Sequence, residues 1–346
     1  MALKLVEGPY LDDILAQPKA VRDTVSALKQ AKPGALRKAL QMDRFQGIVL
    51  TGMGSSFHAL HPLLLRLTGR GRLVAMVETS ELLHGQRGLL GPDRLLVVVS
   101  QSGASVETVR LLRAVRRRCF VVGITNTPEA PLARRADIAV LTRAGSEFSI
   151  SSKTYVATLA ALDWLGEACC GRAPARALRD LETAATAMAS YLAGWKRHVG
   201  FLARRLRGIE YIFLAGRGAS LAAAGTGGLI IKEAAHFPAE GMSAAAFRHG
   251  PLEIVNPRML LLVFEGAGPV AELNLRLVDD VRRAGGQAEL VGWQAGRSAF
   301  RLPEVPGHSL PLLEILPVEM ATLALAALAG REAGRFERAA KITLAE

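Results

Sequence analysis

The stretch that decides the fold is RLLVVVSQSGASVET, residues 94–108. It begins with a short apolar run, Leu95–Val99, whose β-branched residues are typical of a buried parallel strand. A polar turn follows, and a helix is then expected because Val106, Val109 and Leu112 recur at helical spacing. A strand, a tight turn and a helix in this order make up one unit of a parallel α/β sheet.

The polar turn between this strand and this helix predicts an anion site. The first turn of a helix has backbone N–H groups without partners and carries the positive end of the helix dipole. Gly103 lets the backbone approach a ligand closely, and the neighbouring serine hydroxyls add donors. A phosphate monoester fits such a site. The alternative is that these serines only cap the helix.

Composition and length set the class of protein. The 346 residues suggest roughly two domains, and half of the residues are hydrophobic. Three cysteines, Cys119, Cys169 and Cys170, are too few for a disulfide framework, which favours a reducing, cytoplasmic location. We expect no signal peptide and no membrane span, because no apolar run reaches the roughly 18 residues that a span needs.

The net charge of +12 would suit a nucleic-acid partner, but the basic residues are scattered. The only tight run is Arg116–Arg118, and it lacks interleaved aromatic residues. We therefore expect no nucleic-acid partner and interpret the run as a solvated helix end. The positive field would help to recruit an anionic substrate.

Strand and helix signals alternate through the first half of the chain. After an N-terminal helical arm over residues 1–34, the expected strands cover residues 48–50, 73–77, 95–99, 120–124 and 138–141. Residues 155–200 show only helical patterning. This alternation predicts a doubly wound parallel α/β sheet, in which ligands bind at the carboxyl ends of the strands.

The second half of the chain repeats the first. Leu50–Ser56 aligns with Leu214–Ser220, and at the same offset Arg94–Val99 aligns with Arg258–Val263. The copies differ in the serine turn, where the second copy has Phe264, Glu265 and Gly266 in place of Ser100, Gln101 and Ser102. An aromatic ring and a carboxylate do not suit a phosphate, so we expect the anion site in the first copy alone.

Two other motifs give weaker signals. Gly52 and Gly54 suggest a dinucleotide site, but the third glycine position holds the bulky Phe57. His58 and His61 stand at helical spacing, but no matching cysteine or carboxylate follows nearby, so a structural role is expected. We therefore expect no metal and no cofactor.

Three further stretches carry candidate residues. Residues 144–154 are small and rich in hydroxyls, and they either complete a pocket or cap the next helix. Lys232 and Glu233 stand on an otherwise apolar helix predicted over residues 225–240, where burial would raise the pKa of the carboxyl toward that of a general base. The alternative there is an ion pair facing solvent. His249 precedes a Gly-Pro turn and could be functional or an ordinary loop residue.

Taken together, these segments resemble the isomerase part of glutamine–fructose-6-phosphate amidotransferase (glucosamine-6-phosphate synthase), which is built of two SIS (sugar isomerase) domains. The similar segments include GMGSSFHA, SQSGAS, FRHGP and the terminal AAKITLAE. The resemblance implies an α/β fold of two tandem SIS domains, each a doubly wound parallel sheet flanked by helices in a flavodoxin-like three-layer sandwich. The domains would cover residues 35–195 and 196–332, with a tail at residues 333–346 that closes the site.

The resemblance also implies a role for each matching residue. The sugar phosphate would be held by Ser55, Ser56, Ser100, Gln101, Ser102 and Ser105, and the sugar pocket would be lined by Ile150 and Ser152. Glu233 matches the carboxylate that moves a proton between C1 and C2, with Lys232 as a further catalytic candidate. His249 matches the histidine that opens the sugar ring and enters from the neighbouring subunit. Lys341 matches the tail lysine that closes over the sugar carbonyl, and a homodimer with shared sites is expected.

Three departures from the family bear on the activity. The chain begins Met1-Ala2-Leu3, near where the family's interdomain segment would start, so we expect no glutamine hydrolysis by an N-terminal cysteine. Ile230 stands where the synthase usually has a lysine, which removes a charge from the pocket. Residues 334–338 lack the family's proline–arginine pattern.

The function expected from the resemblance is that of a phosphosugar isomerase/deaminase. It would convert glucosamine 6-phosphate to fructose 6-phosphate and ammonia, or run in reverse. The alternatives are a deglycase of amino-acid–sugar 6-phosphate adducts, a plain phosphosugar isomerase, and a phosphosugar sensor without turnover. A sensor would not need Glu233, His249 and Lys341 together, and a dinucleotide oxidoreductase is a more distant alternative.

Overall fold

The computed structural model describes residues 7–31, 38, 40, 42–115, 118–338 and 341, so Arg116 and Arg117 of the basic run lie outside the described residues. Within this part, the chain divides into two compact units. The N-terminal unit holds residues 19–147, 152–182 and 341, and the C-terminal unit holds residues 7–18, 148–151 and 183–338. The domain bounds at 35–195 and 196–332 stay a prediction.

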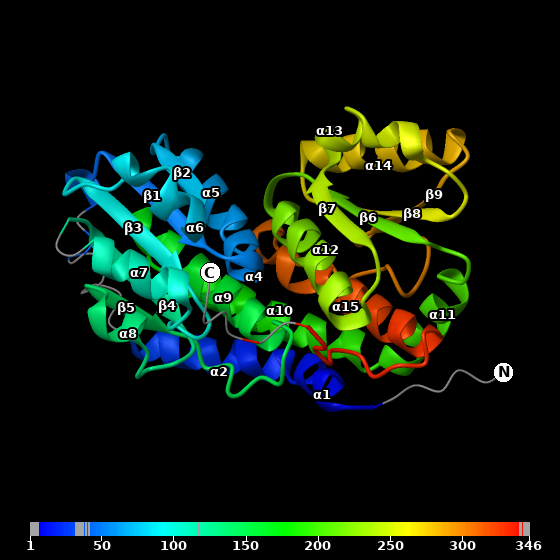
Figure 1. The fold of residues 1–346 in the computed structure, drawn as a ribbon, viewed down its shortest axis with the longest axis horizontal. Coiled ribbons are helices and arrows are strands. Elements are labelled where there is room, and N and C mark those ends of the chain that lie inside the picture. Colours follow the sequence, from blue (N-terminus) through cyan, green and yellow to red (C-terminus); the bar gives the residue numbers. More distant parts are fainter. Residues whose placement is uncertain are drawn as a thin grey trace. The chain divides into compact units, whose positions relative to one another are not determined.

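The N-terminal unit is built on a five-stranded parallel sheet of order β2-β1-β3-β4-β5 (Figure 1). Its strands are β1 (Gly47–Gly52), β2 (Val74–Glu78), β3 (Arg94–Val99), β4 (Phe120–Thr125) and β5 (Ile138–Leu141). All five strands predicted from the sequence are therefore present. The central strand β3 is buried on both faces, with Leu95–Val99 at most 2% exposed, which explains its unbroken apolar run.

Helices cover both faces of this sheet. They are α2 (Gln17–Gln30), α4 (Gly54–His58), α5 (His61–Thr68), α6 (Thr79–His84), α7 (Val106–Ala114), α8 (Pro131–Arg135) and α9 (Lys153–Cys169), with short 3₁₀ turns at Met42–Arg44 and Arg87–Leu89. On one face, α6, α7 and α8 pack leucines such as Leu82, Leu111 and Leu132 against β1, β3 and β4. On the other face, α5 packs against α9, which also contacts β4. The result is the three-layer sandwich expected from the sequence.

The C-terminal unit repeats the same order in a four-stranded parallel sheet, β7-β6-β8-β9 (Figure 1). The strands are β6 (Tyr211–Gly216), β7 (Ala239–Ser243), β8 (Met259–Phe264) and β9 (Gln287–Val291). Helices α13 (Ala244–Phe247) and α14 (Pro269–Arg283) cover one face, and α12 (Leu221–Ala235) and α15 (Leu310–Leu328) pack together on the other. The remaining helical elements are α1 (Pro9–Leu15), α10 (Ala175–Leu192), α11 (Trp195–Arg205) and 3₁₀ turns at Gly218–Ser220, Pro251–Ile254 and Gly307–Ser309.

Helix α12 is shorter than the predicted range of residues 225–240. It ends at Ala235, and β7 begins at Ala239. Pro238 lies between the two elements and has no N–H to extend a helix, so this part of the prediction is wrong.

One helical stretch of the described residues is long and apolar enough to cross a membrane, although Glu314 and Glu319 interrupt its apolar run. The stretch Gly307–Leu328, which contains α15, meets the length and composition of a span. Most of it is buried inside the structure, however, as in the core helix of a folded domain.

Candidate active site

The predicted phosphate-binding serines lie at one edge of the N-terminal sheet. Strands β1 and β3 are parallel neighbours, with Ile48 opposite Leu95. Ser55 and Ser56 stand in α4 just beyond the carboxyl end of β1, and Ser100 directly follows β3. The two serine groups are therefore brought to the same carboxyl edge, where ligands bind in sheets of this kind.

Gly103 fixes the shape of the serine turn. Its φ of +61° lies in the left-handed region that favours glycine. A Cβ at this position would stand 2.7 Å from Ala130 Cβ and 2.8 Å from Thr125 Oγ1. The backbone turn is held further by the Leu132 N–H, which donates to Gly103 O at 3.1 Å. Only glycine therefore fits here without displacing the neighbouring chain.

The serine hydroxyls of the turn accept hydrogen bonds from its own backbone. Ser100 Oγ accepts from the Gly103 N–H at 3.2 Å, and Ser102 Oγ accepts from the Ala104 N–H at 3.3 Å. A hydroxyl that accepts a bond still has its own O–H to donate. Ser105 instead caps α7, because its Oγ accepts from the Thr108 N–H. Ser105 therefore does cap α7, and the hydroxyls of Ser100, Ser102 and Ser105 can each still donate a hydrogen to an anion.

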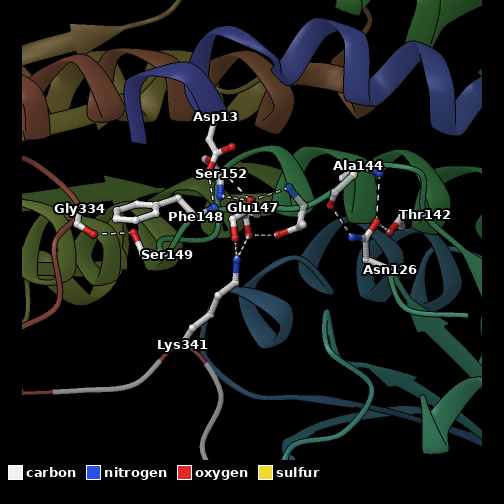
Figure 2. Close-up of polar contacts among 12 residues, drawn as sticks. Asp13, Asn126, Thr142, Ala144, Glu147, Phe148, Ser149, Ser152, Gly334 and Lys341 are labelled. Carbon is white, nitrogen blue, oxygen red and sulfur yellow. Dashed lines mark hydrogen bonds and ion pairs between the residues drawn. The ribbon is translucent and has the colours of Figure 1, made fainter. Parts of the chain in front are cut away.

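A cavity of about 560 Å³ opens in the N-terminal unit. Its walls include Gln101 from the serine turn, Asn126 from the end of β4, and Glu147 with Lys341. Gln101 and Lys341, two site residues predicted from distant parts of the sequence, therefore line one cavity. Asn126 organises the wall: its Oδ1 accepts from Thr142 Oγ1 and the Ala144 N–H, both at 3.0 Å (Figure 2).

Glu147 is a buried carboxyl that the sequence reasoning missed. Its Oε1 accepts the N–H groups of Ser152 and Thr154, both at 3.0 Å, and its Oε2 accepts from Thr154 Oγ1 at 2.7 Å (Figure 2). Burial raises the pKa of Glu147, and these hydrogen bonds and Lys341 oppose the rise. Lys341 donates to the Glu147 carbonyl, and its Nζ lies 3.8 Å from Oε2. An acid just ahead of a predicted helix was the signal that could have revealed it.

The hydroxyl-rich loop before α9 is buried in its last part and exposed in its first. Ile150 is 1% exposed and Ser152 is fully buried. Ser149 Oγ donates to the carbonyl of Gly334 at 2.5 Å, and the Phe148 N–H donates to Asp13 Oδ2 at 2.6 Å (Figure 2). The expectation that the loop caps the next helix is confirmed through Glu147, whereas a contact of Ile150 and Ser152 with a sugar stays a prediction.

Glu233 opens on a second cavity, of about 400 Å³, in the C-terminal unit. Glu233 stands in the last turn of α12, and Phe237, Phe336 and Arg338 line the cavity with it. Burial raises the pKa of Glu233 to about 7, and the neighbouring charge of Lys232 opposes this rise. The predicted direction of the pKa is therefore confirmed, and the carboxyl is suited to give and take a proton near neutral pH.

Lys232 points to a different partner. Its side chain is 47% exposed, and its Nζ lies 3.5 Å from Glu240 Oε2. Lys232 therefore faces solvent, but its carboxylate partner is Glu240 and not Glu233, so the expected Lys232–Glu233 ion pair is wrong. Ile230, at the position of the family's lysine, is fully buried.

His249 and Glu233 lie at opposite edges of the C-terminal sheet. Helix α12 starts after the carboxyl end of β6 and ends where β7 begins, because β6 and β7 are parallel. Its 15 residues span about 22 Å. His249 follows β7 and α13, at the carboxyl edge, and is exposed. One copy of the chain therefore does not bring these two residues together.

The histidine pair after β1 lies on α4 and at the start of α5. The rings of His58 and His61 stack with centroids 6.5 Å apart. Burial, with a contribution from His58, lowers the pKa of His61 to about 4. Across the described residues, no group of three or more His, Cys, Asp or Glu side chains is arranged to hold a metal ion.

The second copy of the serine turn is filled by acidic side chains. Ser220, which aligns with Ser56, donates its Oγ hydrogen to Glu314 Oε1 at 2.7 Å. Burial, with a contribution from Glu265, raises the pKa of the Glu314 carboxyl to about 8. Glu265, at the position of Gln101, accepts the side-chain amide of Gln294 at 2.6 Å. The Ser220 hydroxyl and the Glu265 carboxylate are thus already bonded to side chains of the chain itself.

Comparison with known proteins places this geometry in a family. A family model, the SIS domain, matches residues 46–168 and 205–329. The glutamine–fructose-6-phosphate aminotransferase of Pyrococcus horikoshii is 28% identical over 97% of this chain and 57% of its own length. The corresponding enzyme of Sulfolobus acidocaldarius is 29% identical over 81% of this chain and 47% of its own length. The chain thus spans about half the length of the curated relatives it matches.

Solved structures show the same fold. The C-terminal domain of glucosamine-fructose-6-phosphate aminotransferase from Francisella tularensis has a TM-score of 0.83 at 20% identity, covering 95% of this chain and 98% of its own. Tagatose-6-phosphate ketose/aldose isomerase from Escherichia coli has a TM-score of 0.78 at 20% identity, covering 97% and 98%. Because the family model matches once in each half, over most of the chain, the chain belongs to the SIS domain family and carries two copies of that domain.

Proposed function

We propose that this protein is a phosphosugar isomerase/deaminase that acts on amino-hexose 6-phosphates. The reaction would convert glucosamine 6-phosphate and water to fructose 6-phosphate and ammonia, or run in reverse. The observation that carries the proposal is Glu233, a half-buried carboxyl with a pKa near 7 that opens on its own cavity. The serine turn at the edge of β1 and β3 supports it as a phosphate site.

The phosphate would be the handle of the substrate. Ser55, Ser56, Ser100, Gln101 and Ser102 would bind it, with hydroxyl and backbone N–H donors at the start of a helix dipole. Ser105, which also caps α7, would bind it through its own O–H. Binding energy from a phosphate remote from the reacting carbons can be used to hold those carbons in place.

Glu233 would move the proton that isomerises the sugar. Once the ring is open, the substrate is a 2-amino aldehyde. The carboxylate takes the proton from C2 and returns it to C1, which converts this 2-amino aldehyde to an imine at C2. Water then adds to the imine, the C–N bond breaks, and ammonia leaves with fructose 6-phosphate as the other product. A base with a pKa close to the working pH favours both halves of this transfer.

Three further residues would assist. His249, from the neighbouring subunit of a homodimer, would transfer the proton that opens the ring. Lys341 would polarise the open-chain carbonyl with its ammonium group, with Lys232 as an additional positive charge. The cytoplasmic location and the dimer remain part of this proposal.

A direct test is to incubate the protein with glucosamine 6-phosphate and measure ammonia and fructose 6-phosphate. We expect both products in equal amounts, and Glu233→Gln should lower kcat by about 10² to 10⁴ while leaving the affinity for the sugar phosphate nearly unchanged. Glu272→Gln is the matched control, because it removes an exposed carboxylate of the same unit that pairs with Arg276. Wild-type protein that binds the sugar phosphate without turning it over would favour the sensor alternative.

A plain aldose–ketose isomerase is the second candidate, because Ile230 replaces the family's lysine with a fully buried apolar side chain. In that case fructose 6-phosphate or a related ketose phosphate would be interconverted with its aldose, and no ammonia would appear. The same incubation, run with ketose phosphates and with amino-acid–sugar 6-phosphate adducts, separates this candidate and the deglycase from the deaminase.

A further inference from the structure

His236 has a backbone conformation that is unusual for its residue type. It follows the last residue of α12 with φ 51° and ψ 41°, and it is the one non-glycine residue of positive φ in the described part of the chain. A left-handed residue at this position commonly ends a helix, but glycine or asparagine usually fills it. For other residues this conformation costs roughly 1–2 kcal/mol. A requirement for a cap alone would therefore favour glycine, which indicates a use for the imidazole.

The imidazole of His236 bonds to the segment that follows α15. Its Nε2 lies 3.2 Å from the Arg335 carbonyl, and its Nδ1 accepts from the guanidinium of Arg331. Arginine can only donate, so Nδ1 must be unprotonated and Nε2 must carry the hydrogen. Glu337 lies close by as well, with its Oε2 3.7 Å from Nδ1.

Residues 331–338, here named the tail segment, are held at a second point. The Gly334 N–H donates to the Ala234 carbonyl in the last turn of α12 at 2.9 Å. Gly334 has a φ of +79°, and a Cβ there would meet Tyr10 at 2.7 Å. The backbone of the tail segment thus runs directly against the end of α12, where Glu233 stands.

The tail segment forms part of the cavity of Glu233. Phe336, Glu337 and Arg338 line it together with Phe237. His236 also borders the cavity. It follows the candidate base Glu233 by three residues and lies against the tail segment, which completes the cavity wall. If His236 lost its bonds to Arg331 and Arg335, the tail segment would still be joined to α12 by the hydrogen bond from the Gly334 N–H to the Ala234 carbonyl.

We propose that His236 is a positioning residue that holds the tail segment against the cavity of Glu233. It acts through Phe336 and Arg338, whose places it fixes, and not on substrate. The effect on turnover rests on the proposed function, in which Glu233 transfers a proton. The docking of the tail segment by His236 is independent of the proposed function.

The test compares His236→Gly, His236→Asn and His236→Gln. Glycine and asparagine suit the left-handed backbone, so both variants should fold, but neither side chain reaches the tail segment as the imidazole does. Glutamine can place an amide N–H near the position of Nε2 and should restore the bond to the Arg335 carbonyl. Limited trypsin digestion, followed by mass spectrometry of the C-terminal fragments, reports cleavage after Arg335 and Arg338.

We expect cleavage at these two sites to be about tenfold faster in His236→Gly and His236→Asn, and to return toward the wild-type rate in His236→Gln. Where the wild type turns over a phosphosugar, kcat should fall about tenfold in the first two variants with an unchanged KM. Glu272→Gln, which removes an exposed ion pair with Arg276 in the same unit, is the matched control and should change neither measurement.

A purely structural cap gives the opposite result. His236→Gly would then be at least as stable as the wild type, with unchanged cleavage and unchanged kcat, and the proposal would be wrong. If the wild type turns over no phosphosugar, the proposed function fails while the trypsin rates still decide whether His236 docks the tail segment.

Discussion

Glu233 and His249 stand at opposite edges of one parallel sheet, with α12 running the full depth between them. In the proposed function, both residues are acid–base groups of one active site. Since a single copy of the chain holds them apart, a site that uses both must take them from two copies. This relationship gives a physical reason for the expected homodimer.

Mixing two inactive variants tests this arrangement. Glu233→Gln chains and His249→Ala chains should each lack activity alone, and after unfolding and refolding together they should regain about one quarter of the wild-type activity. Random pairing makes half of the dimers mixed, and each mixed dimer has one intact site of two. Refolding either variant by itself is the control. A mixture that stays inactive, with mixed dimers present, would mean that each site is built within one chain.

The raised pKa of Glu233 predicts a pH-dependent gain of stability on substitution. Because the folded-state pKa is about 7 and the ordinary value is 4.5, folding favours the protonated carboxyl. That contribution is complete below about pH 4.5 and is lost as the pH rises through 7. Glu233→Gln should therefore be more stable than the wild type at pH 8, by up to about 3 kcal/mol, and equally stable at pH 4.

Denaturant unfolding of both proteins across this pH range measures the difference. Glu210→Gln, which changes an exposed carboxylate in the same unit, should give a curve parallel to that of the wild type. A Glu233→Gln advantage that does not vary with pH would show that burial does not raise the pKa of this carboxyl.

Substituting the serine turn should weaken the binding of phosphorylated sugar. The double variant Ser100→Ala, Ser102→Ala removes two hydroxyl donors, each worth about 1 kcal/mol or more toward an anion, so KM should rise about 10- to 100-fold. Ser243→Ala removes a hydroxyl that caps α13 in the C-terminal unit and is the matched control. Kinetics or calorimetry with a hexose 6-phosphate gives the comparison, and an unchanged KM would place the phosphate elsewhere.

Gly103 and Gly71 form a matched pair for the shape of the serine turn. Both have positive φ, +61° and +73°, but a Cβ at Gly103 would meet Ala130 and Thr125, whereas nothing lies within 4 Å of one at Gly71. Gly71→Ala should cost only the left-handed strain of about 1 kcal/mol. Gly103→Ala should cost roughly 2–4 kcal/mol and also weaken phosphate binding. Equal melting temperatures for the two variants would contradict this account of the turn.

The sequence predicted the sheets better than the long-range contacts. Buried β-branched runs such as Leu95–Val99 have few alternatives to a central parallel strand, and the repeat predicted the second sheet. The end of α12 was placed too late, although Pro238 was a signal against a longer helix. The stretch Gly307–Leu328 is long enough to span a membrane. It did not stand out in the sequence, because charged and proline residues interrupt its apolar run.

The candidate site was predictable only where a motif is local. The serine turn could be recognised from consecutive residues, but the contacts of Glu147 with Lys341 and of His236 with Arg335 join residues about 194 and 99 positions apart. No spacing rule connects such positions in a single sequence. The left-handed conformation of His236 was likewise invisible, because residue type alone favours glycine or asparagine there.

The pairing of Ser220 with Glu314 has a consequence for stoichiometry. Although the chain carries the same fold twice, one of the two equivalent edges already has an acidic side chain of its own seated against the serine, with Glu265 close by. A dianion would find the hydroxyl of Ser220 already bonded to Glu314 instead of open to a ligand. Equilibrium dialysis with a hexose 6-phosphate should therefore saturate at a single equivalent for each polypeptide, and the duplication leaves the other half free for acid–base chemistry.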